Sequence, residues 1–136
     1  MSHPAELPDL FLDRSLGSIH VPNALRAAGL RLTTLAERYG SEHAQFVRDT
    51  EWLDEAGRRG EAVLMKDSRI YVNPLERAVV HQAGVRCFCL SKKNLKSEQM
   101  ARWFLKNLVR MASACSDPAP FMYVVYENGI RRVENK

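Results

Sequence analysis

The stretch Leu10-Phe11-Leu12-Asp13-Arg14-Ser15-Leu16-Gly17 decides the fold class. It begins with three large apolar residues in a row, which is typical of a short strand buried on both faces of a parallel sheet. The apolar run ends in a carboxylate, Asp13. Because ligands of open α/β sheets bind at the carboxyl ends of the strands, Asp13 is a candidate site residue. The alternative is that it only caps the following turn or helix.

Apolar runs alternate with helical periods along the rest of the chain. Further strands are predicted over Leu30–Leu35, Ala62–Met65, Cys87–Leu90 and Phe121–Tyr126, with a short edge at Ile130–Val133. Helices are predicted over His20–Ala28, from an Asp49 N-cap to Gly57, over Pro74–Ala83, and from a Ser97 N-cap to about Ser113. The segment Ala36–Arg48 predicts a loop with one helical turn, and Ile70–Val72 an extended segment. Strands that alternate with helices predict an α/β fold with a mostly parallel sheet of about five strands.

Composition predicts one globular domain over residues 1–136, with its core at about 9–133. The chain has 46% hydrophobic and 26% charged residues and a net charge of +4, which permits a polyanionic partner. No apolar run approaches the roughly 20 residues of a membrane span, and the first residues do not resemble a signal peptide. We therefore expect a cytoplasmic protein. Cys87 and Cys89 form a C-x-C pattern that is a poor zinc signature, so we expect both in the core.

Three acids are predicted to meet at one edge of the sheet. Asp13 and Asp67 each follow a buried apolar run, and Asp49 opens the helix between two strands. Right-handed crossovers bring strand ends and helix N-termini to the same rim. Clustered carboxylates repel one another and persist mainly where a cation neutralises them. Hard oxygen ligands favour Mg²⁺ or Mn²⁺, and such a site can activate water against a phosphodiester.

Three motifs carry a resemblance to a known family: Leu10–Asp13, Asp49–Leu53 and Val63–Asp67. Together they resemble PIN-like domains, particularly the branch related to VapC toxin ribonucleases. The resemblance implies a three-layer α/β/α sandwich and metal-dependent RNA cleavage by a toxin that a co-expressed antitoxin restrains. It also implies that Asp13, Asp49 and Asp67 are the catalytic metal ligands. The expected partners are RNA, the antitoxin and a second copy of the chain in a homodimer or hetero-oligomer.

Two positions depart from the family pattern. Arg69 stands where many PIN nucleases have a fourth acid, and Met65 stands where Thr or Ser is frequent. A second metal ion is therefore in doubt unless Glu51 or Glu76 contributes a ligand. The alternative function is a catalytically degenerate PIN-like domain that binds protein or RNA.

Basic residues near the predicted rim are candidates for RNA phosphate binding. Lys92 and Lys93 follow a strand, whereas Arg14 and Lys66 lie beside Asp13 and Asp67 and could instead pair with these acids. Other enzyme classes fit less well. The sequence has neither a P-loop nor a dinucleotide-binding glycine motif. Ser15 stands where a haloacid dehalogenase phosphatase needs an acid, and the first strand lacks the acid pair of a phosphoacceptor receiver domain.

Overall fold

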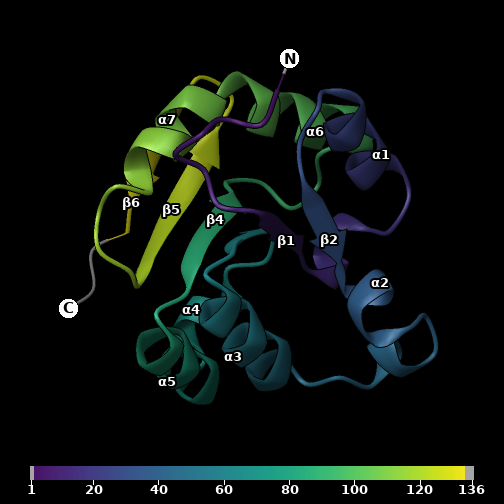
Figure 1. Cartoon of the computed structure of the whole chain (residues 1–136), viewed down its shortest axis with the longest axis vertical. Coiled ribbons are helices and arrows are strands. Elements are labelled where there is room, and N and C mark those ends of the chain that lie inside the picture. The colour runs from purple at the N-terminus through teal and green to yellow at the C-terminus, as the bar shows by residue number, and fades with distance from the viewer. Residues whose placement is uncertain (1, 134–136) are drawn as a thin grey trace.

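A six-stranded sheet lies between two layers of helices in the computed structural model, which describes residues 2–133 (Figure 1). The strand order is β2-β1-β3-β4-β5-β6, and all pairs are parallel except the antiparallel pair of β5 and β6. The strands are β1 (Leu10–Leu12), β2 (Leu32–Thr34), β3 (Ala62–Met65), β4 (Arg86–Leu90), β5 (Phe121–Tyr126) and β6 (Gly129–Arg132). The predicted α/β class is confirmed. The predicted count of about five strands was one too low, and the short edge predicted over 130–133 is the sixth strand, β6, which pairs with β5.

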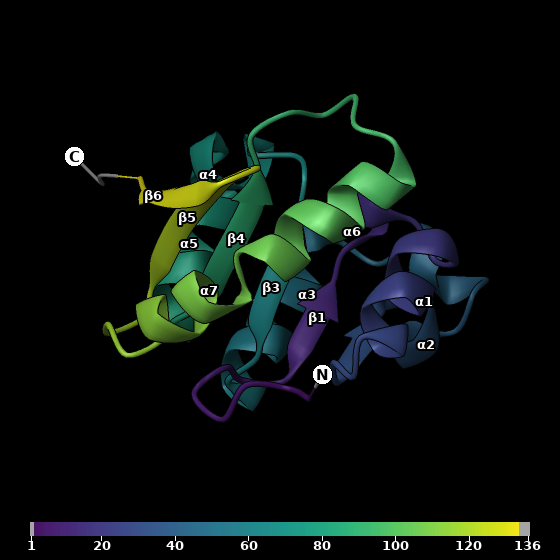
Figure 2. The same cartoon turned by 90° about the horizontal axis from the view of Figure 1, so that it is seen from above.

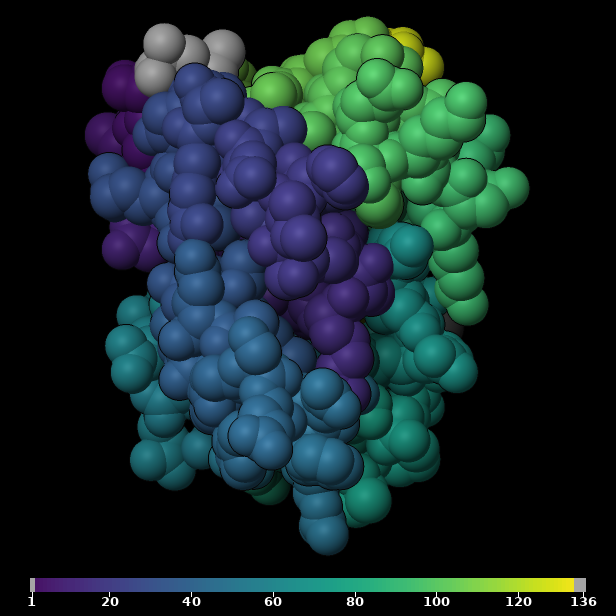
Figure 3. Space-filling model, turned by 90° about the vertical axis from the view of Figure 1, so that its right-hand side faces the viewer, coloured from purple at the N-terminus to yellow at the C-terminus, as the bar shows by residue number. Residues whose placement is uncertain are grey.

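Helices cover both faces of the sheet (Figure 2). One face carries α1 (His20–Ala27), α6 (Ser97–Lys106) and α7 (Leu108–Ala114), and the other carries α3 (Asp49–Arg59), α4 (Arg69–Val72) and α5 (Pro74–Ala83). A short helix α2 (Leu35–Tyr39) and two 3₁₀ turns, η1 (Arg14–Leu16) and η2 (His43–Gln45), complete the elements. Figure 3 shows α1 in purple-blue beside α6 in green. No helix within residues 2–133 has the length and apolar character to cross a bilayer.

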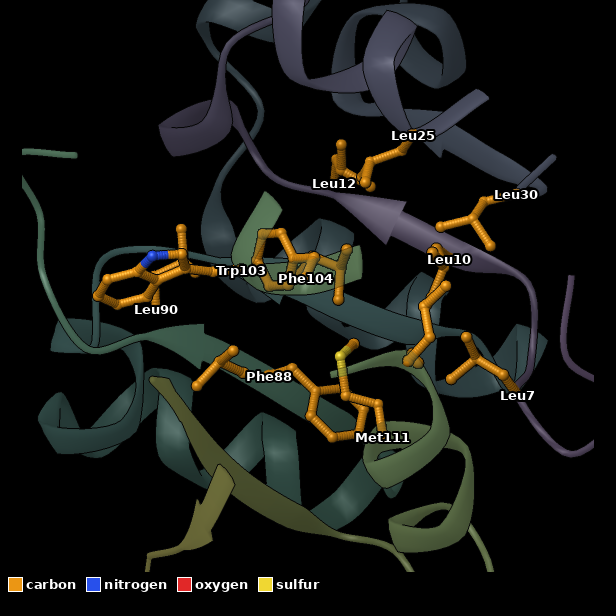
Figure 4. Close-up of a cluster of buried hydrophobic side chains, with 14 of the residues drawn as sticks. Leu7, Leu10, Leu12, Leu25, Leu30, Phe88, Leu90, Trp103, Phe104 and Met111 are labelled. Carbon is orange, nitrogen blue, oxygen red and sulfur yellow. The ribbon is translucent and has the colours of Figure 1, made fainter. Parts of the chain in front are cut away.

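The strands divide their side chains between two hydrophobic cores. Leu10 and Leu12 of β1 point into the core under α1, α6 and α7, while Phe11 points into the core under α3 and α5. This alternation follows from the two-residue period of a strand. Figure 4 shows the first core, in which Leu10 and Leu12 approach Phe104. Cys87 and Cys89 are buried in the second core, as the sequence predicts.

Parallel pairing brings the ends of β1, β3 and β4 to one rim of the sheet. Leu12 of β1 is in register with Leu64 of β3, which in turn pairs with Phe88 of β4. The residues that follow these strands therefore emerge together. Polar side chains can lie close together at this rim, whereas the centre of the sheet is apolar.

Two local predictions were wrong near the rim. Ile70–Val72 is not extended but lies in α4, in which Ile70 and Tyr71 are buried and Val72 is exposed. The second strand is only Leu32–Thr34, because Thr34 already caps α2. Its side chain accepts the backbone N–H of Glu37, and the Glu37 carboxylate accepts the N–H of Thr34, so a capping box ends the strand. The predicted loop over 36–48 thus contains most of α2 and also η2.

The predicted long helix from Ser97 is split in two at Asn107. The side-chain amide of this fully buried residue donates to the carbonyls of Trp103, at 2.8 Å, and Tyr126, at 2.7 Å. A side-chain amide that binds nearby backbone competes with regular helix geometry, and α6 ends while α7 begins on the other side of this residue. The N-cap is Lys96 rather than Ser97, which is the first helical residue.

Candidate functional site

Asp13 lies directly after β1 and is 5% exposed. Its backbone N–H donates to the carbonyl of Leu64, so the pairing of β1 with β3 extends to the acid itself. The carboxylate oxygen Oδ1 accepts two hydrogen bonds from Ser15, one from the backbone N–H at 3.1 Å and one from the hydroxyl at 2.5 Å. The Ser15 hydroxyl oxygen in turn accepts the backbone N–H of Lys66. This chain of contacts fixes Asp13 to the ends of both strands.

The charged form of Asp13 is also disfavoured by its surroundings. Burial raises the pKa of Asp13 to about 7, and the charges of Asp49 and Asp67 raise it as well, although the hydrogen bonds from Ser15 lower it. Removing a carboxylate from water disfavours its charged form. Near neutral pH both the protonated and the charged form of Asp13 therefore occur, and a nearby cation would favour the charged form.

Asp49 is the first residue of α3. The predicted N-cap role is wrong, because the extended residue Arg48 occupies the cap position without a side-chain hydrogen bond. The Asp49 carboxylate instead accepts a 2.9 Å hydrogen bond from the indole Nε1 of Trp52. Trp52 is fully buried against Phe11 of β1. Its ring therefore holds Asp49 to the helix end that faces the rim.

Asp67 follows β3 and is surrounded by cations. Its Oδ2 accepts from the Nε of Arg69 at 2.8 Å and lies 2.5 Å from Nη2, while Oδ1 accepts the backbone N–H of Arg69 at 3.0 Å. The Nζ of Lys93, which follows β4, is 3.8 Å from Oδ1. Hydrogen bonding to Arg69 lowers the pKa of Asp67. Unlike Asp13, this carboxylate stays charged.

A single cleft of about 530 Å³ contains these acids. It is lined by Asp13, Arg14, Ser15, Asp49, Asp67, Arg69, Ile70, Asn73 and Glu76. The structure thus brings the three predicted acids together with Glu76, one of the two additional candidates. Burial raises the pKa of Glu76, and the charge of Asp49 adds to this effect. The other candidate, Glu51, is exposed and does not line the cleft; its charge acts on Tyr39.

Two polar residues of the cleft were not foreseen from sequence. Ser15 supports Asp13 as described above, and Asn73 caps α5 by accepting the N–H groups of Leu75 and Glu76. An Asn-Pro pair at 73–74 before a helical period is a recognisable N-cap signal. The start of α5 at Pro74 was predicted correctly, and the same signal could have identified Asn73 as its cap. The role of Ser15 depends on β3 and carries no such local signal.

The predicted phosphate-binding residues occupy different surroundings. The Arg14 guanidinium lines the cleft, but its Nη2 donates to the carbonyls of Ala44 and Val47, at 3.3 and 2.7 Å, and so ties η1 to the η2 loop. Lys66 does not line the cleft. Lys92 and Lys93 are exposed beside the rim, and Lys93 faces Asp67.

The donor set of the cleft suits a hard divalent cation. It offers carboxylate oxygens from four acids. Burial raises the pKa values of Asp13 and Glu76, and the charges of neighbouring acids add to this effect. As the side chains stand, no group of three or more acidic, His or Cys side chains within residues 2–133 is close enough to hold a metal ion. Arg69 and Lys93 supply the positive charge beside Asp67 instead.

Comparison with known proteins adds two findings. A family model described as "PIN like domain" matches residues 8–92. Over 129 residues the chain is 40% identical to "Putative ribonuclease VapC45" of Mycobacterium tuberculosis (strain ATCC 25618 / H37Rv), an alignment that covers 95% of this chain and 94% of that protein. No solved structure matches this chain. The segment matched by the family model contains every residue that lines the cleft.

Proposed function

Because this chain belongs to the PIN-like domain family, we propose that it is a divalent-metal-dependent endoribonuclease and the toxin of a toxin–antitoxin pair. The observation that carries the proposal is the convergence of Asp13, Asp49, Asp67 and Glu76 on one cleft at the carboxyl rim of the sheet. The similarity to a protein named a ribonuclease supports the same reaction class.

Asp13, Asp49 and Asp67 are the proposed ligands of a Mg²⁺ or Mn²⁺ ion, with Glu76 as a further oxygen donor. When bound, such an ion polarises a phosphodiester and makes a water molecule more acidic. Asp13 is the best-positioned ligand because Ser15 and the β3 backbone fix it. Its tendency to take up a proton at neutral pH is removed when positive charge approaches.

The other residues of the rim have proposed roles in RNA binding. Lys93 is exposed next to Asp67 and can contact a phosphate that lies over the cleft, with Lys92 beside it. Arg14 shapes the wall of the cleft through its two carbonyl contacts and presents its positive charge there. RNA is the expected substrate, and the cytoplasm is where we expect the protein to act. A cognate antitoxin and a second copy of the chain are the proposed protein partners.

One observation favours a second candidate function. Arg69 and Lys93 already neutralise Asp67, as they would in a degenerate PIN-like domain that binds protein or RNA without cleaving it. The two functions differ in whether the carboxylates are needed for turnover.

Cleavage of total RNA, with Mg²⁺ and with EDTA, tests the proposal. We expect Mg²⁺-dependent cleavage by the wild type and a loss of about 100-fold or more in Asp13→Asn and Asp67→Asn, because each removes a ligand charge from the site. Asp54→Asn is the matched control, since Asp54 lies along α3 and pairs with Arg58 outside the cleft. Full activity of Asp13→Asn would exclude this mechanism, and RNA binding without cleavage would favour the degenerate domain.

A further inference from the structure

Among the residues that the structure describes, no other cationic residue brings as many donors to an acid of the cleft as Arg69 brings to Asp67. Three donors of the same residue, its backbone N–H, Nε and Nη2, reach the two carboxylate oxygens. Arg69 begins α4, only two residues after the acid, so the contact closes a tight local ring. The planar guanidinium suits a carboxylate because it offers two parallel donors.

The positive charge of Arg69 also acts on the rest of the acid cluster. Arg69 lines the same cleft, and its pKa is raised first by Asp67 and to a smaller degree by Asp49 and Glu76. The guanidinium therefore stands among three carboxylates where a hard cation would be attracted. It neutralises part of their negative charge.

We propose that Arg69 is a built-in counter-ion of this cleft, which pairs with Asp67 when no divalent cation is bound, releases it when one binds, and then contacts an RNA phosphate. The inference rests on the proposed function of the cleft as a metal-dependent RNA site. It goes further by coupling cation binding to RNA binding through one side chain.

The exposure of the pair makes this exchange feasible. The Arg69 side chain is 80% exposed and that of Asp67 23%, so release of Arg69 returns a guanidinium to water rather than leaving it buried. Exposed ion pairs are weak, whereas a doubly charged cation gains from several carboxylates at once. After release, the guanidinium stays tethered at the rim, and its fork of donors also fits phosphate oxygens.

Calorimetric titration of Mn²⁺ into the metal-free protein tests the competition. We expect Arg69→Gln to bind Mn²⁺ roughly 3- to 10-fold more tightly than the wild type, because the competing guanidinium is gone. Arg58→Gln is the matched control: it removes an exposed arginine from the far end of α3 and should stay within about 2-fold of the wild type. Equal or weaker Mn²⁺ binding by Arg69→Gln would overturn the counter-ion role. A wild type that binds no Mn²⁺ at all would instead contradict the proposed function.

Binding of a single-stranded RNA oligonucleotide in Ca²⁺, which takes the same oxygen ligands, tests the transfer. We expect Arg69→Gln to bind the RNA about 3- to 10-fold more weakly than the wild type, and Arg69→Lys to fall between them because it keeps the charge but loses the fork. In EDTA the wild type and Arg69→Gln should differ by less, since Asp67 then holds the arginine. Unchanged RNA affinity of Arg69→Gln in Ca²⁺ would overturn the transfer, even if Mn²⁺ binding improved.

Discussion

Asp13 combines deep burial with neutral hydrogen-bond partners, and this combination makes its charge costly. Its carboxylate accepts two hydrogen bonds from Ser15, and its negative neighbours Asp49 and Asp67 add repulsion. The folded protein therefore binds the Asp13 proton more tightly than the unfolded chain does. The free energy of unfolding must then depend on pH through this residue.

The sign of that dependence is opposite to the usual one for a carboxyl group. Because burial raises the pKa of Asp13 from 3.8 to about 7, the stability contributed by its protonated form is lost as pH rises through this range. We expect the free energy of unfolding of the wild type to fall by on the order of 2–4 kcal/mol between pH 4 and pH 8 because of Asp13, and this fall should be absent in Asp13→Asn. Urea denaturation in EDTA at several pH values measures it, with Asp54→Asn as control. Parallel stability curves for the wild type and Asp13→Asn would contradict the prediction.

The sequence anticipated the acids of the cleft better than their partners. Asp13 and Asp67 were recognisable because an apolar run ends at each, and Asp49 because a helical period begins there. The structure places all three in one cleft, while their role as metal ligands stays a prediction. The hydroxyl of Ser15 could not be assigned, because its contact with Lys66 joins residues that only the β1–β3 pairing brings together.

At the scale of elements, α3 and α5 pack side by side, and the first turn of each contributes an acid to the cleft. Asp49 begins α3, and Glu76 lies in the first turn of α5. Toward the other ends of the two helices, Gly57 of α3 packs directly against Ala83 of α5. A Cβ built on Gly57 would be 2.6 Å from both the Cβ and the carbonyl oxygen of Ala83. Such a contact requires the helices to separate.

We therefore expect Gly57→Ala to destabilise the protein by about 1–3 kcal/mol, even though alanine favours a helix by up to about 1 kcal/mol over glycine. The separation should also weaken Mn²⁺ binding by moving Asp49 relative to Glu76. Chemical denaturation and calorimetry measure the two effects, and Arg58→Ala on the exposed face of α3 is the control. A more stable Gly57→Ala variant would show that helix propensity outweighs the contact.

The elements themselves were predictable where one periodicity dominated. The buried strands β1 and β3 and the helices α3 and α5 lie close to their predicted ranges. The failures occur where a side chain interrupts a period. Thr34 ends β2 by capping α2, and Asn107 interrupts a helix by binding the carbonyl of Tyr126 on β5. Ile70–Val72 has apolar residues suited to either state, and its short helix depends on local backbone contacts.

At the scale of the whole molecule, the acid cluster sits at the junction of segments far apart in the sequence. Its acids follow β1 and β3 and begin α3 and α5, so a cation bound among them links the central strands to one helical layer. Their repulsion in the metal-free protein acts against the same links. The stability of the entire fold should therefore respond to the cation.

We expect saturating Mg²⁺ to raise the melting temperature of the wild type on the order of 5–10 °C, as binding at about 100 times Kd stabilises a protein by about 2.7 kcal/mol. The shift should be much smaller in Asp13→Asn and unchanged in Asp54→Asn. Differential scanning calorimetry measures it, with NaCl at equal ionic strength as the reference. The same Mg²⁺ shift in Asp13→Asn as in the wild type would place the cation elsewhere.

The two outer strands of the sheet have a further consequence, for self-association. β2 is three residues long, and the antiparallel β6 ends in the exposed arginines Arg131 and Arg132. Unpaired strand edges are templates on which another chain can add and start aggregation, whereas short edges and charged edge residues oppose this. A sheet edged in this way is protected against the addition of a strand from another copy of the chain.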